Sequence, residues 1–282
     1  MRAKEGILVD KINLVNSSIQ GIYIESCDRK AQLQINKDVF NSTHFNLSMG
    51  NMYINHVNEN IDDDLIAKII EAGLREAKNR GFQHLTCKCD TNNKNVIYYL
   101  ENEEFHLMDT LVTYVFSYNK DHLNKVEHQC IIRDCEYEDL PTLKEIAIKS
   151  FKIDRFHSDR LLNKSKSDEY YEKWIENSYN GLADKTMVAE FDGVPVGFTT
   201  GKLPNIEDKS RSGQLVLSAV SESSRGKGIY TSMIYAGVKW LEGKANTVKV
   251  GTQINNIAVQ KSWIKLGFTV FDSQYVFHKI LE

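Results

Sequence analysis

Long apolar runs, a basic excess and paired cysteines are all missing from this sequence. Among its 282 residues no apolar stretch approaches the roughly 20 residues of a membrane-spanning helix, and Met1 to Gln20 lacks the apolar core of a signal peptide. The formal net charge is −3, so the sequence lacks the excess of Lys and Arg that is typical of a nucleic-acid binder. The five cysteines show no C-x-x-C spacing and no further ligands nearby. We therefore expect a cytoplasmic protein with plain thiols, no metal site, and neither a membrane nor a nucleic acid as partner.

Proline is also scarce, with three in the chain, so few breaks mark domain boundaries. The clearest joint is the polar stretch Asn119 to Lys125, which separates two strand-like runs. We therefore expect two domains, at residues 1–120 and 121–282.

The two sides of this joint resemble each other at a fixed offset. Asn93 and Asn256 are 256 − 93 = 163 positions apart, and Phe105 and Phe268 are 268 − 105 = 163 positions apart. A shared offset indicates one helix–strand–helix–strand unit used twice, with a chance likeness of two α/β stretches as the alternative.

Helical and extended patterns alternate along the chain. Apolar residues recur at helical spacing in Asp62 to Lys78, where Asp62 suits the N-cap, and again in Ile229 to Leu241. Asp192-Gly193 between β-rich runs predicts a hairpin. Strands are expected at Thr186 to Glu190, Val196 to Thr200 and Leu215 to Val220. This alternation predicts an α/β fold with a mixed sheet covered by helices.

The stretch from Leu215 to Thr231 reads as a strand, a loop with two glycines, and an amphipathic helix. A loop entering a helix leaves backbone N–H groups without internal partners, and these groups and the helix dipole favour an anion such as a pyrophosphate. Gly226 and Gly228 allow close approach to the backbone, and Arg225 and Lys227 add positive charge. Taken alone this pattern also fits an ordinary turn.

The context of the loop resembles the GCN5-related N-acetyltransferase (GNAT) superfamily. The superfamily's Arg/Gln-x-x-Gly-x-Gly/Ala loop is matched from Arg225 through Gly228. Its later signature, an Asn followed by Ala, an aromatic residue and Gly-Phe, is matched by Asn256, Ala258, Trp263, Gly267 and Phe268. The resemblance covers Gln129 to Glu282. It implies a GNAT fold, a mixed and mostly antiparallel sheet with helices on both faces, preceded by a truncated GNAT-like N-terminal half.

The resemblance also implies acetyl-CoA as co-substrate and a direct attack of an acceptor amine on the thioester. The pantetheine arm would lie along the strand of Leu217 to Val220, and the pyrophosphate on the amides of Gly226 to Thr231. The cofactor-binding residues that follow are Leu217, Ser218, Ala219, Val220, Arg225, Gly226, Lys227, Gly228, Ile229, Tyr230, Thr231, Asn256 and Trp263.

A narrower likeness spans most of the chain and concerns the TDP-fucosamine acetyltransferases. It is carried by Arg155-Phe-His157-Ser-Asp, by the helix with Tyr170-Tyr171, and by Gly251-Thr-Gln253. It implies a primary-amine acceptor on a nucleotide-linked deoxyaminosugar, contacted by Arg155 and His157. The stretch from Lys149 to Lys166 carries six Lys or Arg against two Asp, 6 − 2 = +4, which suits a diphosphate but also fits a solvated loop.

Two positions depart from the family pattern. Tyr230 stands where the loop motif has Gly or Ala, so either its side chain points away from the coenzyme or CoA binding weakens. Trp263 stands where the sugar acetyltransferases have a Tyr thought to protonate the leaving thiolate, and an indole N–H is not a practical acid. Tyr275 and His278 are weak catalytic candidates to replace it, although Tyr275 also fits a half-buried strand residue. Trp263 also fits a simple packing role.

Alternatives to the sugar acceptor remain open. The acceptor could be another small amine, an antibiotic or a protein N-terminus, or the chain could be a catalytically silent acyl-CoA-binding module. The first half has no Arg-x-x-Gly before its helix, so we expect it to bind no acyl-CoA. A homodimer is expected from general frequencies of assembly alone.

Overall fold

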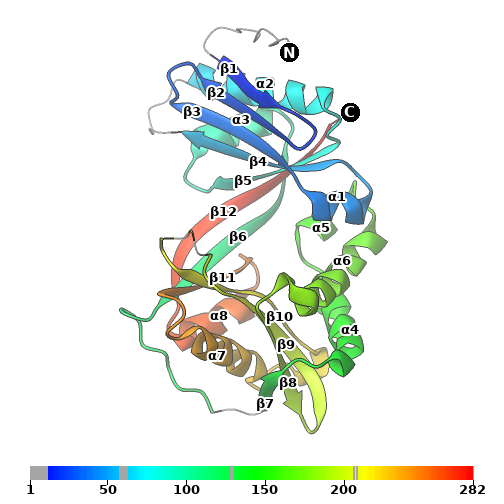
Figure 1. Cartoon of the computed structure of the whole chain (residues 1–282), viewed down its shortest axis with the longest axis vertical. Coiled ribbons are helices and arrows are strands. Elements are labelled where there is room, and N and C mark those ends of the chain that lie inside the picture. Colours follow the sequence, from blue (N-terminus) through cyan, green and yellow to red (C-terminus); the bar gives the residue numbers. More distant parts are fainter. Residues whose placement is uncertain (1–11, 57–62, 128–129, 206, 208, 282) are drawn as a thin grey trace. The chain divides into compact units, whose positions relative to one another are not determined.

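The computed structural model describes residues 12–281 except 57–62, 128–129, 206 and 208. The chain forms two compact units (Figure 1). Unit 1 contains residues up to 110 together with 274–282, and unit 2 contains residues 111–273. The N-cap predicted at Asp62 lies outside the described residues. No described helix is long and apolar enough to cross a membrane.

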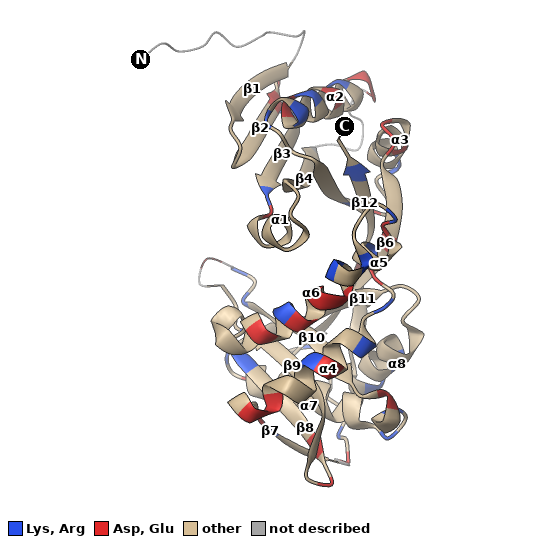
Figure 2. Ribbon diagram, turned by 90° about the vertical axis from the view of Figure 1, so that its right-hand side faces the viewer, with Lys and Arg blue, Asp and Glu red and all other residues tan. Residues whose placement is uncertain are grey.

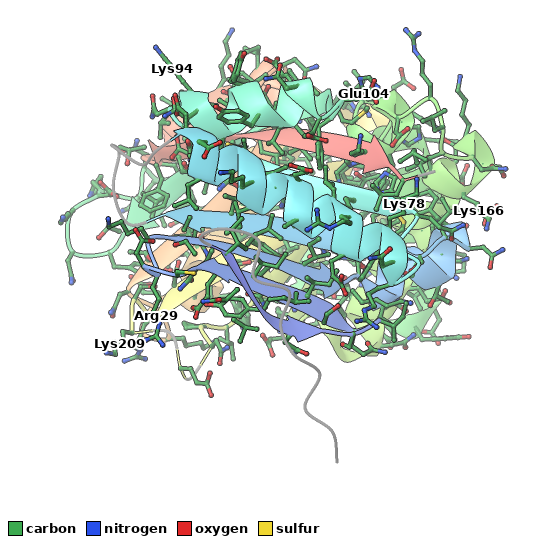
Figure 3. All side chains as sticks on the ribbon, turned by 90° about the horizontal axis from the view of Figure 1, so that it is seen from above. Arg29, Lys78, Lys94, Glu104, Lys166 and Lys209 are labelled. Carbon is green, nitrogen blue, oxygen red and sulfur yellow. The ribbon has the colours of Figure 1, made fainter. Side chains whose placement is uncertain are left out.

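Unit 1 is a sheet with helices packed against it. Its strand order is β1-β2-β3-β4-β5-β12. The strands are β1 Ile12–Ser17, β2 Gly21–Ser26, β3 Ala31–Lys37, β4 Met49–His56, β5 His84–Asp90 and β12 Thr269–Ile280. The helices are α1 Val39–Phe45, α2 Asp63–Asn79 and α3 Lys94–Asn102. The apolar stripe predicted for α2 is confirmed, because Leu65, Ile66, Ile69, Ile70, Leu74 and Ala77 are all buried. Lys78 and Lys94, in α2 and α3, are exposed (Figure 3).

Unit 2 is built on parallel and antiparallel strands in the order β6-β11-β10-β9-β8-β7, with helices on both faces. The strands are β6 His106–Ser117, β7 Ile131–Asp134, β8 Lys185–Phe191, β9 Val194–Lys202, β10 Ser212–Val220 and β11 Thr247–Gln253. The helices are α4 Leu140–Ser150, α5 Arg155–Ser158, α6 Lys164–Asn177, α7 Ile229–Leu241 and α8 Ile257–Leu266. Acidic and basic residues mix along α6 (Figure 2), and Lys144 of α4 forms an ion pair with Glu176 of α6 at 2.7 Å.

The hairpin predicted at Asp192-Gly193 is confirmed. It joins β8 to β9, and both of its residues have positive φ, 52° and 75°. Two successive residues at positive φ are typical of the tight turn whose twist matches the flanking strands.

The repeat is visible in the elements themselves. β5, α3 and β6 begin at residues 84, 94 and 106, and β11, α8 and β12 begin at 247, 257 and 269, which is an offset of 163 in every case. The turns agree too, because Asn93 N–H donates to the Asp90 carbonyl and Asn256 N–H to the Gln253 carbonyl, at 3.0 Å each. The chain therefore uses one supersecondary unit twice.

The last strand of each repeat pairs outside its own half of the sequence. Gln274–Ile280 of β12 pairs antiparallel with His84–Asp90 of β5, and Leu111–Ser117 of β6 pairs antiparallel with Thr247–Gln253 of β11. The compact units therefore divide after residue 110 and again after residue 273, whereas the domain boundary expected between 120 and 121 follows the sequence repeat and stays a prediction.

Candidate coenzyme and acceptor site

The site begins where two neighbouring parallel strands of unit 2 part. β10 pairs with β11 only from Ser212 to Leu215, opposite Thr247 to Val250. Beyond that point β10 continues along β9 as far as Val220, and β11 continues along β6 as far as Gln253. In the described part of the chain, the β10 edge after Leu215 has no β11 partner. An extended group could therefore bind there by pairing with strand backbone.

A row of backbone donors lies at the start of α7. The N–H groups from Gly226 to Thr231 have no acceptor among the described residues, whereas the Ser232 N–H already donates to the Gly228 carbonyl at 3.0 Å. Gly228 is the N-cap and supplies no side-chain cap. These donors and the positive end of the helix dipole form a site for an anion.

Both loop glycines adopt a backbone conformation that other residues rarely take. Gly226 has φ +79° and Gly228 has φ +76°. A Cβ added at Gly226 would have no atom within 4 Å, so the loop faces open space there. Glycine suits both positions because it adopts a positive φ without the steric cost that other residues have.

Positive side chains surround these donors. Arg225 and Lys227 are exposed, and neither forms an ion pair with a carboxylate in the described residues. The Lys227 Nζ lies 4.9 Å from the centre of the Phe191 ring. Both cations thus remain free to pair with a bound phosphate group.

The Tyr230 side chain packs into the core of unit 2. It contacts the cluster built around Trp263 and Val238 and also the cluster built around Met233. Burial raises the pKa of its hydroxyl, so the phenol stays protonated at working pH. The bulky residue in the phosphate-loop motif therefore leaves the amides of the loop uncovered.

Trp263 is a core residue of the same cluster. It is 3% exposed, and its ring centre lies 5.4 Å from that of Tyr114 in an edge-on contact. Its buried indole nitrogen faces the Tyr230 hydroxyl, which is its polar neighbour in this cluster. The packing role is thereby observed, and a contact with the coenzyme stays a prediction.

Asn256 lies at the end of β11, directly before α8. Its Nδ2 donates to the Thr252 Oγ1 at 3.0 Å. Gln260 braces the same turn, because its Nε2 donates to the carbonyls of Gln253 and Ile254 at 3.3 and 2.8 Å. The predicted coenzyme residue therefore lies at the end of the strand that diverges from β10.

His157 is held between two carboxylates. Its Nδ1 lies 2.5 Å from the Asp154 Oδ2 and its Nε2 lies 3.1 Å from the Asp168 Oδ1. Asp154 is 3% exposed and also caps α5 by accepting from the backbone N–H of Phe156. Because both ring nitrogens are engaged, His157 connects α5 to α6 in this structure, and its contact with an acceptor stays a prediction.

Arg155 is free to bind an anion. Its guanidinium carbon lies 4.5 Å from the centre of the Phe156 ring, and among described residues no carboxylate forms an ion pair with it. Stacking on an aromatic face leaves the edge donors of a guanidinium available for phosphate oxygens.

Comparison with known proteins shows a family likeness for this part of the chain. A model described as the Acetyltransferase (GNAT) family matches residues 146–268, which include the loop and Asn256. Residues 146–268 therefore resemble the GNAT acetyltransferases.

Two curated relatives match about half of the chain. The spore coat polysaccharide biosynthesis protein SpsD of Bacillus subtilis is 29% identical over 143 residues, which are 50% of this chain and 47% of that protein. A dTDP-fucosamine acetyltransferase of Escherichia coli is 26% identical over 140 residues, 49% of this chain and 58% of that protein. The chain thus matches about half the length of these relatives.

Solved structures with the GNAT fold match nearly the whole chain. A GCN5-related N-acetyltransferase from Sphaerobacter thermophilus gives a TM-score of 0.66 at 14% identity, over 93% of this chain and 81% of that one. A tandem GNAT protein from the clavulanic acid biosynthesis pathway gives a TM-score of 0.61 at 12% identity, over 96% of this chain and 83% of that one. The predicted fold class, including a GNAT-like first half, is therefore confirmed.

The weak catalytic candidates lie on the part of β12 that belongs to unit 1. Tyr275 is a half-buried strand residue opposite Cys89, and His278 is 1% exposed with its ring centre 4.6 Å from that of His84. Both residues belong to unit 1, whereas the loop with Gly226 and Gly228 belongs to unit 2. Their catalytic role stays a prediction.

Sequence reasoning missed two threonines of unit 2. Thr199 and Thr200 are the last two residues of the strand predicted at Val196 to Thr200, and in the structure both lie in β9. The Thr199 Oγ1 lies 2.7 Å from the Ser218 Oγ, and the Thr200 Oγ1 accepts from the Leu217 N–H at 3.0 Å. The β-branched pattern places them on a strand but gives no sign that they bond to β10.

Proposed function

We propose that the protein uses acetyl-CoA to acetylate the primary amine of a nucleotide-linked deoxyaminosugar. The observation that carries the coenzyme is the row of unpaired N–H groups from Gly226 to Thr231, next to a strand edge that opens after Leu215. The acceptor is supported by the names of the two curated relatives, which concern a fucosamine sugar and a polysaccharide.

Each part of the site has a task in this reaction. The amides of the loop hold the pyrophosphate, and Arg225 and Lys227 neutralise its charge. The free edge of β10 holds the pantetheine arm in an extended form. The acceptor amine then attacks the thioester carbonyl carbon, the C–S bond breaks, the amine loses its proton, and the CoA sulfur gains one. Positioning of the two reactants supplies most of the acceleration.

Arg155 would bind the diphosphate of the acceptor. Its guanidinium is stacked on Phe156 and has no described carboxylate partner, so a phosphate would not need to displace one. A charge-assisted bond of this kind contributes about 1.5–3 kcal/mol, or roughly ten- to a hundredfold in affinity.

The first half would act as a scaffold without acyl-CoA. β4 and β5 also pair in parallel over four residues, Met49 to Met52 with His84 to Cys87, so the strands part as β10 and β11 do. However, the first turn of α2 carries Asp63 and Asp64, whereas that of α7 has no acidic residue. Carboxylates at a helix N-terminus occupy the favourable field that a pyrophosphate needs.

A thiol-release assay on the full chain tests this function. Acetyl-CoA would be supplied with TDP-4-amino-4,6-dideoxyhexoses, free amino sugars, polyamines and a peptide N-terminus. We expect turnover with the nucleotide sugars alone. Turnover with polyamines or the peptide, and none with the sugars, would contradict the acceptor. CoA binding without turnover on any acceptor would favour a silent module.

Arg155→Ala is the matched test of where the acceptor binds. We expect the KM for the nucleotide sugar to rise roughly tenfold or more while the KM for acetyl-CoA stays the same. Arg160→Ala, an exposed arginine of the same segment, removes the same charge and serves as the control. Equal effects of both variants would mean that Arg155 acts only through overall charge.

A further inference from the structure

The opening between β10 and β11 begins beside a β-bulge. The pairing of β10 with β9 passes from Leu215 opposite Gly201 to Ser218 opposite Thr199. Two β10 residues, Val216 and Leu217, therefore stand opposite the single residue Thr200. A bulge of this type bends its strand and increases its twist. The last β10–β11 pair, Leu215 with Val250, comes directly before it.

A side chain takes the place of a backbone acceptor at the bulge. The Leu217 N–H donates to the Thr200 Oγ1 at 3.0 Å, and the two residues are 3% and 1% exposed. A buried backbone N–H without an acceptor is costly, and a bulge leaves its extra residue outside the regular ladder. The Thr200 hydroxyl removes that cost and thus stabilises the bulged form of β10.

A second hydroxyl contact fixes the next residue. The Ser218 Oγ and Thr199 Oγ1 lie 2.7 Å apart, and Thr199 is fully buried. Successive side chains of a strand point to opposite faces of its sheet, so Thr199 and Thr200 hold β10 from both faces. The strand is therefore tied to β9 at the residues where it leaves β11.

We propose that Thr200 is a positioning residue for the coenzyme. Its hydroxyl keeps β10 bulged at Leu217, and the bulge keeps the edge from Val216 to Val220 away from β11 and open to the pantetheine arm. The proposal rests on the proposed use of acetyl-CoA. It does not depend on which amine is acetylated.

Thr200→Val tests the proposal, because valine has the shape of threonine and cannot accept a hydrogen bond. We expect CoA to bind the full-length variant about tenfold more weakly in calorimetry, equivalent to about 1.4 kcal/mol. The KM for acetyl-CoA should rise in step while the KM for the acceptor stays the same. Thr200→Ser keeps the hydroxyl and should restore binding to within about threefold of the original protein, which is about 0.6 kcal/mol.

Thr186→Val is the matched control. Thr186 lies directly opposite Thr200 on β8, and its Oγ1 is buried without a hydrogen-bond partner in the described part of the chain. The control should therefore bind CoA as the original protein does. An unchanged CoA affinity in Thr200→Val, or equal losses in both valine variants, would overturn the role of Thr200 and leave the coenzyme proposal intact. An unaltered protein that does not bind CoA would overturn the coenzyme proposal, and the role of Thr200 with it.

Amide hydrogen exchange of the unaltered protein tests the contact without any variant. With no coenzyme present, the Leu217 amide should exchange slowly, as the amides of paired residues in β10 do. Fast exchange at Leu217 would show that the Thr200 hydroxyl does not hold it and would overturn the proposal, even if Thr200→Val fails to fold.

Discussion

Gly226→Asp is expected to weaken CoA binding at least tenfold more than Gly226→Asn does. Gly226 has φ +79° and faces open space, a conformation that Asn and Asp tolerate better than other side chains do. Both variants should therefore keep the loop and differ only in charge. A carboxylate about 4 Å from a phosphate costs roughly 1–4 kcal/mol, depending on how much water screens the pair.

Calorimetry with CoA at two salt concentrations measures this difference. The difference in CoA affinity between the Asp and Asn variants should decrease as the salt concentration rises, because screening weakens a charge–charge effect and not a steric one. Equal affinities of the two variants at low salt would mean that the pyrophosphate does not lie at the loop.

Phe277→Ala is expected to destabilise unit 1, although residue 277 lies near the end of the second half of the sequence. Phe277 is 2% exposed and belongs to the cluster that contains Ile66, Ile69 and Leu85. Removing a buried phenyl ring costs about 3–5 kcal/mol. Hydrogen exchange by mass spectrometry should show faster exchange in α2 with little change in α7.

Phe268→Ala is the matched control for this experiment. Phe268 is also 2% exposed, but it belongs to the cluster of Val238, Trp263 and Leu266 in unit 2. Its loss should accelerate exchange in α7 and leave α2 unchanged. Faster exchange in α7 on Phe277→Ala, with α2 protected, would contradict the assignment of this part of β12 to unit 1.

Strand pairing also decides how the first half can be tested. An isolated fragment of residues 1–120 would lack Gln274–Ile280, the strand segment that pairs with β5 and contributes Phe277 to the core of unit 1. The absence of CoA binding in such a fragment would say little about the folded unit. The full chain is therefore the right protein for every measurement proposed above.

Local patterns predicted much of this architecture. The stripe of α2, the Asp192-Gly193 hairpin and the offset of 163 each depend on spacing within one segment or between two similar ones, and the structure has all three. The pairing of β6 with β11 and of β12 with β5 could not be predicted in the same way. β6 and β12 occupy the same place in the repeat, so either could pair with β5 or β11 by local pattern alone, and tertiary packing decides between them.

The same distinction between local pattern and tertiary packing applies to the candidate site. The loop from Arg225 to Gly228 is a contiguous motif, and its glycines and helix start lie where the sequence indicates. The bulge at Val216 and Leu217 depends on the register of β10 against β9, which no spacing within one strand reveals. The engagement of His157 by Asp154 and Asp168 likewise depends on how α5 packs on α6.

Hydrogen exchange of the full chain with and without acetyl-CoA tests the central claim most directly. The claim is that the coenzyme binds the N–H groups from Gly226 to Thr231, which have no acceptor among the described residues. Acetyl-CoA should slow the exchange of these amides and leave the first turn of α2 unchanged. Unchanged exchange at the loop with saturating acetyl-CoA, or protection only at the start of α2, would contradict it.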